Sequence, residues 1–207
     1  MSLQTWFAFV AAAAILLAIP GPTVTLVVGY ALGVGKRAAW ATVAGVALGD
    51  FAAMTLSLAG LGAVLAASAM LFAVLKWIGA AYLVFLGIRL WRAEPTLDEG
   101  GAASVKPAGA ILWHAFAVTA LNPKSILFFV AFVPQFIDAG APVLPQLVVF
   151  EVTFVAMAAL NAALYAALAG RARRLVRRPA VLKAINRVGG GILVGAGIAA
   201  VAWRRAS

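Results

Sequence analysis

The long apolar runs of this chain, which carry almost no charge, limit most strongly what it can fold into. Residues 5–33 contain no charged side chain, and five further runs lie at about 39–66, 69–91, 110–136, 142–169 and 187–204. A helix that crosses a bilayer needs about 20 apolar residues. The pattern therefore predicts an all-α, polytopic membrane protein with six transmembrane helices, in a single membrane domain that covers residues 1–207.

The composition excludes a water-soluble domain. The chain is 65% hydrophobic and 11% charged, whereas soluble domains are about half apolar and a quarter charged. Its net charge of +10 comes from bases between apolar runs, as expected for membrane topology, so we expect no nucleic-acid partner. The absence of cysteine excludes thiol redox chemistry and thiolate metal sites. The chain has no basic residue before its first apolar run, which favours a retained helix over a cleaved signal peptide.

The basic residues predict how the helices are oriented. Twelve of them follow the first, third and fifth runs, and at most three lie on the opposite side. Cytoplasmic loops carry the excess of lysine and arginine, so both termini are expected outside the cytoplasm. The polar stretch at about 93–109 is then a cytoplasmic linker. The arginine-rich stretch at 171–187 is interpreted as a topology determinant, with an anionic-lipid or partner site as the alternative.

The two halves of the chain, at about 1–92 and 110–207, resemble each other. A shift of 101 residues places Pro22 on Pro123 and Asp50 on Glu151, and a shift of 110 aligns the glycine-rich last helices. Each half has three helices, and because three is odd, the second half must enter the membrane the other way up. The sequence thus predicts an inverted 3+3 repeat, an architecture common in secondary transporters.

Proline interrupts the first helix of each half near mid-span. The interruptions are Pro20-Gly21-Pro22 and Asn122-Pro123-Lys124. Proline lacks an N–H and clashes with the carbonyl four residues earlier, so the carbonyls of Leu16, Ala18 and Thr119 lose their helical partners. Paired breaks at matching positions of two repeats indicate a transport site. The alternative is a pair of packing kinks in which threonine hydroxyls satisfy the freed groups.

Three charged residues lie inside the apolar runs. Asp50 is near the centre of the second run, where an ionised side chain costs about 2.5–3.5 kcal/mol on insertion scales. We interpret it as a carboxylate that carries a proton or binds an amine; a structural ion pair with Lys124 or a neutral Asp50 is the alternative. Lys124 is expected to neutralise Asp50, to bind a substrate carboxylate, or both in turn. Glu151 is a second candidate for proton coupling, nearer a helix end.

Other patterns carry less weight. Three GxxxG pairs permit close helix packing within one protomer or between the protomers of a homodimer: Gly29/Gly33, Gly45/Gly49 and Gly191/Gly195. The single histidine, His114, is expected to be structural, and no metal or cofactor is expected. Asn161 and Asn186 are expected to donate interhelical hydrogen bonds. The motifs of soluble hydrolases, metalloproteases and nucleotide-binding enzymes are missing from the sequence.

Several segments together resemble the lysine exporter and homoserine–threonine resistance (LysE/RhtB) family of bacterial amino acid exporters. They are Pro20-Gly21-Pro22, Gly33 to Arg37 with Gly45, Gly49 and Asp50, Gly60-Leu61-Gly62, Leu75 to Gly87, Asn122-Pro123-Lys124 and Phe132 to Phe136. The resemblance covers essentially the whole chain. It implies a transporter in the bacterial cytoplasmic membrane that exports amino acids or close analogues by proton exchange, without fixing the substrate.

Two classes of function follow from these observations. In a secondary exporter, the substrate site would comprise Pro20, Gly21, Pro22, Asn122, Pro123 and Lys124, and Asp50 and Glu151 would couple transport to protons. The alternatives are an intramembrane enzyme or relay that uses Asp50 and Glu151 as acid and base, or an exporter of another small solute or ion. The enzyme would need a redox or nucleophilic group that the sequence does not offer.

Overall fold

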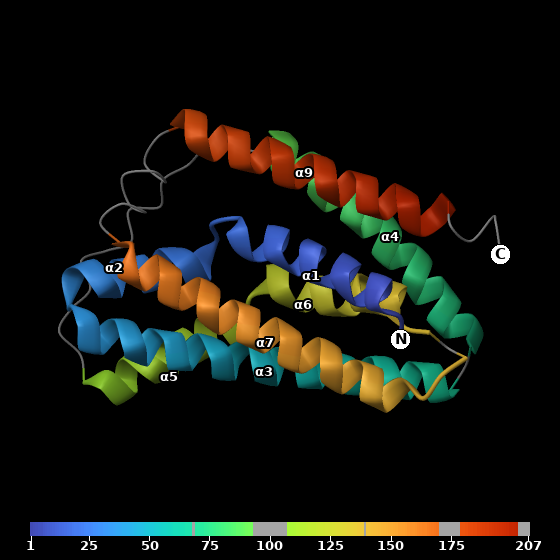
Figure 1. Ribbon diagram of the computed structural model, residues 1–207, viewed down its shortest axis with the longest axis horizontal. Helices are drawn as coiled ribbons and strands as arrows, with labels where there is room; N and C mark the ends of the chain where they lie inside the picture. The colour runs from blue at the N-terminus through green and yellow to red at the C-terminus, as the bar shows by residue number, and fades with distance from the viewer. Residues whose placement is uncertain (68, 93–106, 139, 170–178, 203–207) are drawn as a thin grey trace.

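The chain folds into helices alone throughout its described part. The computed structural model describes residues 1–67, 69–92, 107–138, 140–169 and 179–202, and contains no strand there. The elements, shown in Figure 1, are α1 (Leu3–Ala18), α2 (Pro22–Gly33), α3 (Lys36–Ala67), α4 (Ala69–Arg92), α5 (Ala108–Ala120), α6 (Pro123–Ala131), the short 3-10 helix η1 (Val133–Phe136), α7 (Val143–Ala167) and α9 (Pro179–Ala202).

Both predicted proline breaks are confirmed. α1 and α2 meet at 56°, and α5 meets the segment Pro123–Phe136 at 45°. Pro22 and Pro123 are each the first residue of the helix that follows a break. Proline is well tolerated at this position, because the first N–H groups of a helix have no intrahelical partner. The two prolines that the repeat aligns therefore occupy equivalent places in their halves.

The membrane-spanning character is strongest in four segments. Lys36–Gly60 of α3 and all of α7 are long and apolar enough to cross a bilayer, and each bent pair is also long enough if it is counted as one span. The described helices thus provide two to four membrane-capable segments. α4 and α9 contain 24 residues each, about 36 Å of helix, and lie against each other along one side of the bundle (Figure 1).

Successive helices run back and forth along the long axis of the molecule. α1 begins and α9 ends at the same end of the bundle, where α3 also meets α4 (Figure 1). The junction of α2 with α3 and the end of α7 lie at the opposite end. The basic residues at the start of α3 therefore lie at that end, whereas α4 finishes near the middle of α9, where Trp91 lies against Gly190 and Gly191.

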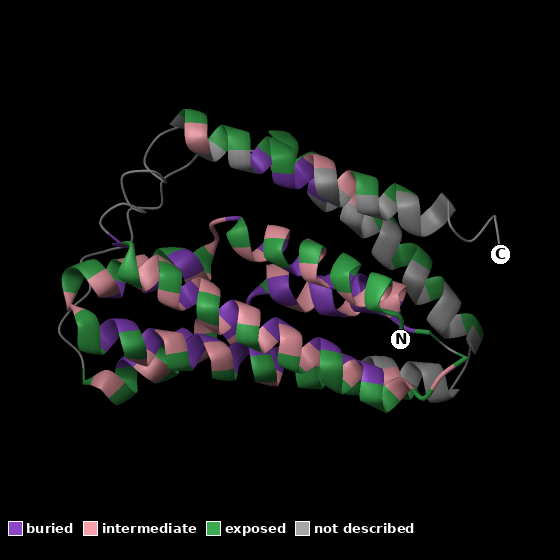
Figure 2. Ribbon diagram, in the orientation of Figure 1, coloured by how far each residue is buried: buried purple, intermediate pink, exposed green. Residues whose placement is uncertain are grey.

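The interior is packed with phenylalanine, and the outside is also apolar. A buried cluster joins α1, α3, α6 and α7 through Phe9, Met54, Phe128 and Phe154, and Figure 2 shows buried residues on the facing sides of these helices. Large apolar side chains such as Leu56 are exposed. An exposed apolar surface of this kind is suited to lipid rather than to water.

α3 and α5 approach closely because α3 carries glycine where they touch. A side chain at Gly45 would collide with the backbone carbonyl of Leu112, and one at Gly49 would lie 2.8 Å from the carbonyl of Phe116. This confirms close packing for one predicted GxxxG pair. Gly29, from another pair, has nothing within 4 Å of such a side chain.

The last helix differs from its predicted extent. α9 begins at Pro179 rather than near 187, and exposed Lys183 and Arg187 belong to its first turns. The apolar run marks only where lipid covers a helix, and proline at a first helical position lets the helix start earlier, in the basic segment. Residues 93–106 of the predicted linker, the arginines at 171–178, and Arg204 and Arg205 lie outside the described residues.

Candidate functional site

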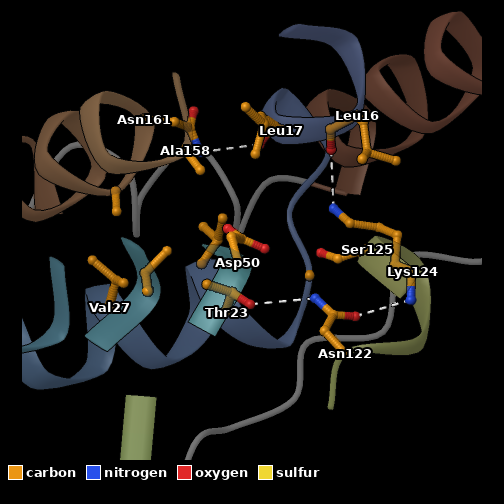
Figure 3. A pocket seen from close by; sticks show the side chains of 14 residues that line it. Leu16, Leu17, Thr23, Val27, Asp50, Asn122, Lys124, Ser125, Ala158 and Asn161 are labelled. Carbon is orange, nitrogen blue, oxygen red and sulfur yellow. Dashed lines mark hydrogen bonds between the residues drawn. The ribbon is translucent and has the colours of Figure 1, made fainter. Parts of the chain in front are cut away.

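A cavity lies where the two halves of the chain meet at the α1–α2 break. Its walls come from α1, α2, α3, α6, α7 and the residues at both breaks, and Figure 3 shows the side chains from close by. The lining residues are Leu16, Leu17, Gly21, Thr23, Val24, Val27, Val46, Asp50, Asn122, Lys124, Ser125, Ala158, Asn161 and Ala162. The site is thus mostly apolar with a few polar groups, as small-molecule sites usually are.

Side chains from the second half satisfy the carbonyls at the end of α1. The Lys124 ammonium donates to the Leu16 carbonyl at 3.0 Å (Figure 3) and to the Ile19 carbonyl at 2.9 Å. Asn161 donates to the Leu17 carbonyl at 3.2 Å. The Tyr165 hydroxyl donates to the Ala18 carbonyl at 3.2 Å.

These bonds meet the cost of breaking a helix inside a membrane. The last carbonyls of any helix lack intrahelical partners, and in hydrocarbon each unsatisfied group costs several kcal/mol. The expectation that Asn161 bonds between helices is confirmed. The carbonyls of Leu16 and Ala18 accept hydrogen bonds from Lys124 and Tyr165 and not from threonine hydroxyls, contrary to the packing-kink alternative.

The two breaks are joined by polar side chains. The Asn122 side chain accepts from the Lys124 backbone N–H at 3.1 Å and thereby caps α6, as serine, threonine, aspartate and asparagine commonly do. Its amide also donates to the Thr23 hydroxyl at 3.3 Å (Figure 3), and this hydroxyl lies 3.4 Å from that of Thr119. The Thr119 carbonyl accepts from the Asn122 backbone N–H at 3.0 Å. Hydrogen bonds of Asn122 and Thr23 thus link the two breaks directly.

Asp50 is buried in the cavity wall without a full set of partners. Its side chain is 3% exposed, and its Oδ1 has no hydrogen-bond partner. Lys124 and Ser125 are the groups that interact with its carboxylate, but no ion pair joins Asp50 to Lys124 in the described part of the chain. A buried polar atom without a partner costs about 1–3 kcal/mol, and more when it is charged. The structural ion pair with Lys124 is thus not formed, and one carboxylate oxygen is left without a partner.

The start of α2 adds positive potential to the same cavity. Gly21 precedes the helix with no side-chain cap, and Gly21, Thr23 and Val24 line the cavity. The first N–H groups of a helix lack intrahelical partners, and the helix dipole favours negative charge there. A side chain at Gly21 would lie 3.5 Å from the Lys124 ammonium nitrogen. The cation and the helix terminus thus border the same space.

Apart from Glu151, the predicted site residues fall into two groups in the structure. Gly21, Asn122, Lys124 and Asp50 line the one cavity. The prolines Pro20, Pro22 and Pro123 shape the breaks and are not among its lining residues.

Glu151 belongs to a different place. It is partly buried in α7 and accepts a hydrogen bond from Thr55 of α3, away from the residues that line the cavity. The repeat aligns it with Asp50, but the two acids have different surroundings. His114 lies elsewhere, with its Nδ1 2.9 Å from the Tyr30 hydroxyl.

Two polar groups at the site were missed by sequence reasoning. Ser125 is buried beside Asp50, and Tyr165 completes the capping of α1. The signal for Ser125 was its place directly after the second break. Tyr165 lies four residues after Asn161, so both face the same side of α7, and a tyrosine hydroxyl within an apolar run needs a partner.

Comparison with known proteins gives the family. The model of the LysE type translocator matches residues 14–202. The homoserine/homoserine lactone efflux protein of Salmonella typhi is 35% identical over 198 residues, which cover 95% of this chain and 96% of the relative. A membrane protein of Vibrio cholerae serotype O1 is 34% identical over 96% of this chain and 97% of its own length.

A further relative matches over a shorter stretch. The leucine efflux protein of Salmonella choleraesuis is 37% identical over 142 residues, 68% of this chain and 66% of the relative. No solved structure matches significantly. The chain belongs to the LysE family of translocators, as its proline and glycine motifs indicated, and it is a membrane transporter rather than an enzyme.

Proposed function

We propose that this transporter exports amino acids or close analogues across the bacterial cytoplasmic membrane in exchange for protons. The named efflux relatives act on homoserine, homoserine lactone and leucine, and all of these molecules carry an amine. The cavity at the α1–α2 break is where we place the substrate.

One observation carries the proposal: the cavity presents a buried carboxylate and a partly buried ammonium that do not pair with each other. Asp50 and Lys124 both line it, and the positive start of α2 borders it. An amino acid carries one ammonium and one carboxylate, so its charges complement these groups. Discontinuous helices with half-helix termini at the substrate are a recurring feature of secondary transporters.

Asp50 is the proposed site of proton coupling. A carboxylate in the cavity can hold either a proton or the substrate ammonium, and this competition makes the two move in opposite directions. Glu151, with its Thr55 partner, is the second candidate for this role.

The proposed membrane arrangement has six spans. The bent pairs, α3, α7, α4 and α9 each cross once, with both termini outside the cytoplasm and the two halves related as an inverted repeat. Support comes from the equal positions of Pro22 and Pro123 at the starts of α2 and α6, and from the common end at which α1 starts and α9 finishes (Figure 1).

Transport by purified protein in proteoliposomes tests the function. With an acidic interior and a clamped membrane potential, protons leave and radiolabelled leucine or homoserine should accumulate. One-to-one exchange predicts about tenfold accumulation per pH unit, since each unit is worth 1.36 kcal/mol. Failure to accumulate any of the common amino acids above protein-free vesicles would end the proposal, and equal accumulation without the gradient would remove proton coupling from it.

A further inference from the structure

We infer that the cavity recognises the free ammonium group of its substrate at Asp50, and that it selects amino acids whose side chain carries no positive charge. The inference rests on the proposed function and names its substrate class. Amino acids with an acylated nitrogen and amino acids with a cationic side chain are both excluded. Three features of the cavity wall support it.

The first feature is the unsatisfied carboxylate. Asp50 is 3% exposed, lines the cavity, and leaves Oδ1 without a hydrogen-bond partner. An ammonium group supplies both the donors and the positive charge that this oxygen lacks, and hydrogen bonds between two charged groups are about twice as strong as neutral ones. Acylation of the substrate nitrogen removes the charge and leaves Asp50 buried without compensation.

The second feature is a separate place for the carboxylate. An ammonium has three N–H donors, and Lys124 uses two of them on the carbonyls of Leu16 and Ile19. The third has no partner among the described residues, and it borders the start of α2 at Gly21. The carboxylate of an amino acid can accept from this donor and from the first N–H groups of α2. In this arrangement Lys124 caps the carbonyls at the end of α1 and binds the substrate carboxylate at the same time.

The third feature is the apolar remainder of the wall. Besides Asp50, no carboxylate is among the described residues that line the cavity. The rest of the surface is mainly aliphatic: Leu16, Leu17, Val24, Val27, Val46, Ala158 and Ala162. With Asp50 bound to the α-ammonium, a second cation on the substrate would be buried beside Lys124 with no partner, which costs several kcal/mol. An uncharged side chain is instead favoured by this surface.

Competition binding to the detergent-purified full chain tests the inference without transport. Tritiated leucine and tritiated homoserine serve as the probes. Unlabelled leucine and homoserine should displace them, whereas N-acetylleucine, lysine and arginine should compete at least tenfold more weakly. The inference would be overturned if N-acetylleucine or lysine displaced the probe at concentrations within threefold of leucine. It would also be overturned if neither probe bound.

An Asp50 variant shows whether the selection resides at this carboxylate. Asp50→Asn should weaken leucine binding at least tenfold and bring the leucine and N-acetylleucine affinities to within threefold of each other. Asp138→Asn, the same change at an exposed acid outside the cavity, should keep the wild-type ratio. A folded Asp50→Asn protein that keeps the ratio contradicts the inference; if this variant does not fold, the wild-type competition decides.

The proposed function can fail separately. Selective binding with no accumulation in proteoliposomes would refute export and leave the recognition of a free ammonium standing. If leucine accumulates and N-acetylleucine inhibits this accumulation as well as unlabelled leucine does, export stands and the recognition of a free ammonium is refuted.

Discussion

At the scale of single residues, the decisive feature is that Asp50 and Lys124 share a cavity without forming an ion pair. Lys124 is held by two backbone carbonyls of the broken helix, so Asp50 keeps an oxygen without a partner. A buried pair with ideal geometry would neutralise both charges and leave nothing for a ligand. In the proposed transport site, the separation keeps each charge available to a zwitterion.

This arrangement makes a prediction about coupling. Asn at position 50 keeps the shape of the side chain but cannot titrate, so Asp50→Asn should abolish accumulation of leucine driven by a pH gradient. Exchange of leucine at equal pH should persist at saturating substrate, because the other contacts remain. The measurement is paired transport in proteoliposomes, with Asp138→Asn as the control. If Asp50→Asn still concentrates leucine, the proton is carried elsewhere, and Glu151 becomes the candidate.

At the scale of elements, the end of α1 is stabilised by helices of the other half. Tyr165→Phe removes only the hydroxyl that donates to the Ala18 carbonyl, and we expect it to lower the free energy of unfolding by about 1 kcal/mol. Adding Asn161→Leu should roughly double the loss. Tyr30→Phe makes the same deletion beside the exposed His114 and should cost less, because water can replace the bond. Equal losses in thermal unfolding for Tyr30→Phe and Tyr165→Phe would contradict this account.

The contact between α3 and α5 makes a second prediction at this scale. Gly49→Ala places a methyl group 2.8 Å from the Phe116 carbonyl, and overpacking of this kind costs about 1–3 kcal/mol. Gly29→Ala adds the same methyl group in open space on α2, where alanine is the better helix former by about 1 kcal/mol. Thermal unfolding in detergent should separate the two variants, and destabilisation of both to the same degree would show that glycine serves some purpose other than packing.

At the scale of the whole molecule, the chain begins at one end of the bundle, and the basic start of α3 lies at the other end (Figure 1). The chain has no cysteine, so single cysteines can be introduced cleanly. In intact cells, a membrane-impermeant thiol reagent should label cysteines at Ser2 and Gly140 but not at Lys36. All three residues are exposed in the structure, so a missing label reports the side of the membrane. The opposite pattern would invert the topology.

The sequence alone determined that this chain is a helical membrane protein with two proline-broken helices, because hydropathy and the missing proline N–H are local properties. Family membership also followed, from motifs that keep their spacing. The sequence could not predict where α9 starts, because apolar runs mark lipid contact and not helix ends. Nor could it show that Gly45 and Gly49 pack against a neighbouring helix while Gly29 does not.

Only the tertiary structure decided which groups meet. Lys124 lies 108 residues from Leu16 along the chain, yet donates to its carbonyl, and Asn161 and Tyr165 complete the same cap from α7. The aligned acids Asp50 and Glu151 likewise have different neighbours, one in the cavity wall and the other beside Thr55. Partners of this kind depend on how distant helices pack, and no local pattern of residues encodes that packing.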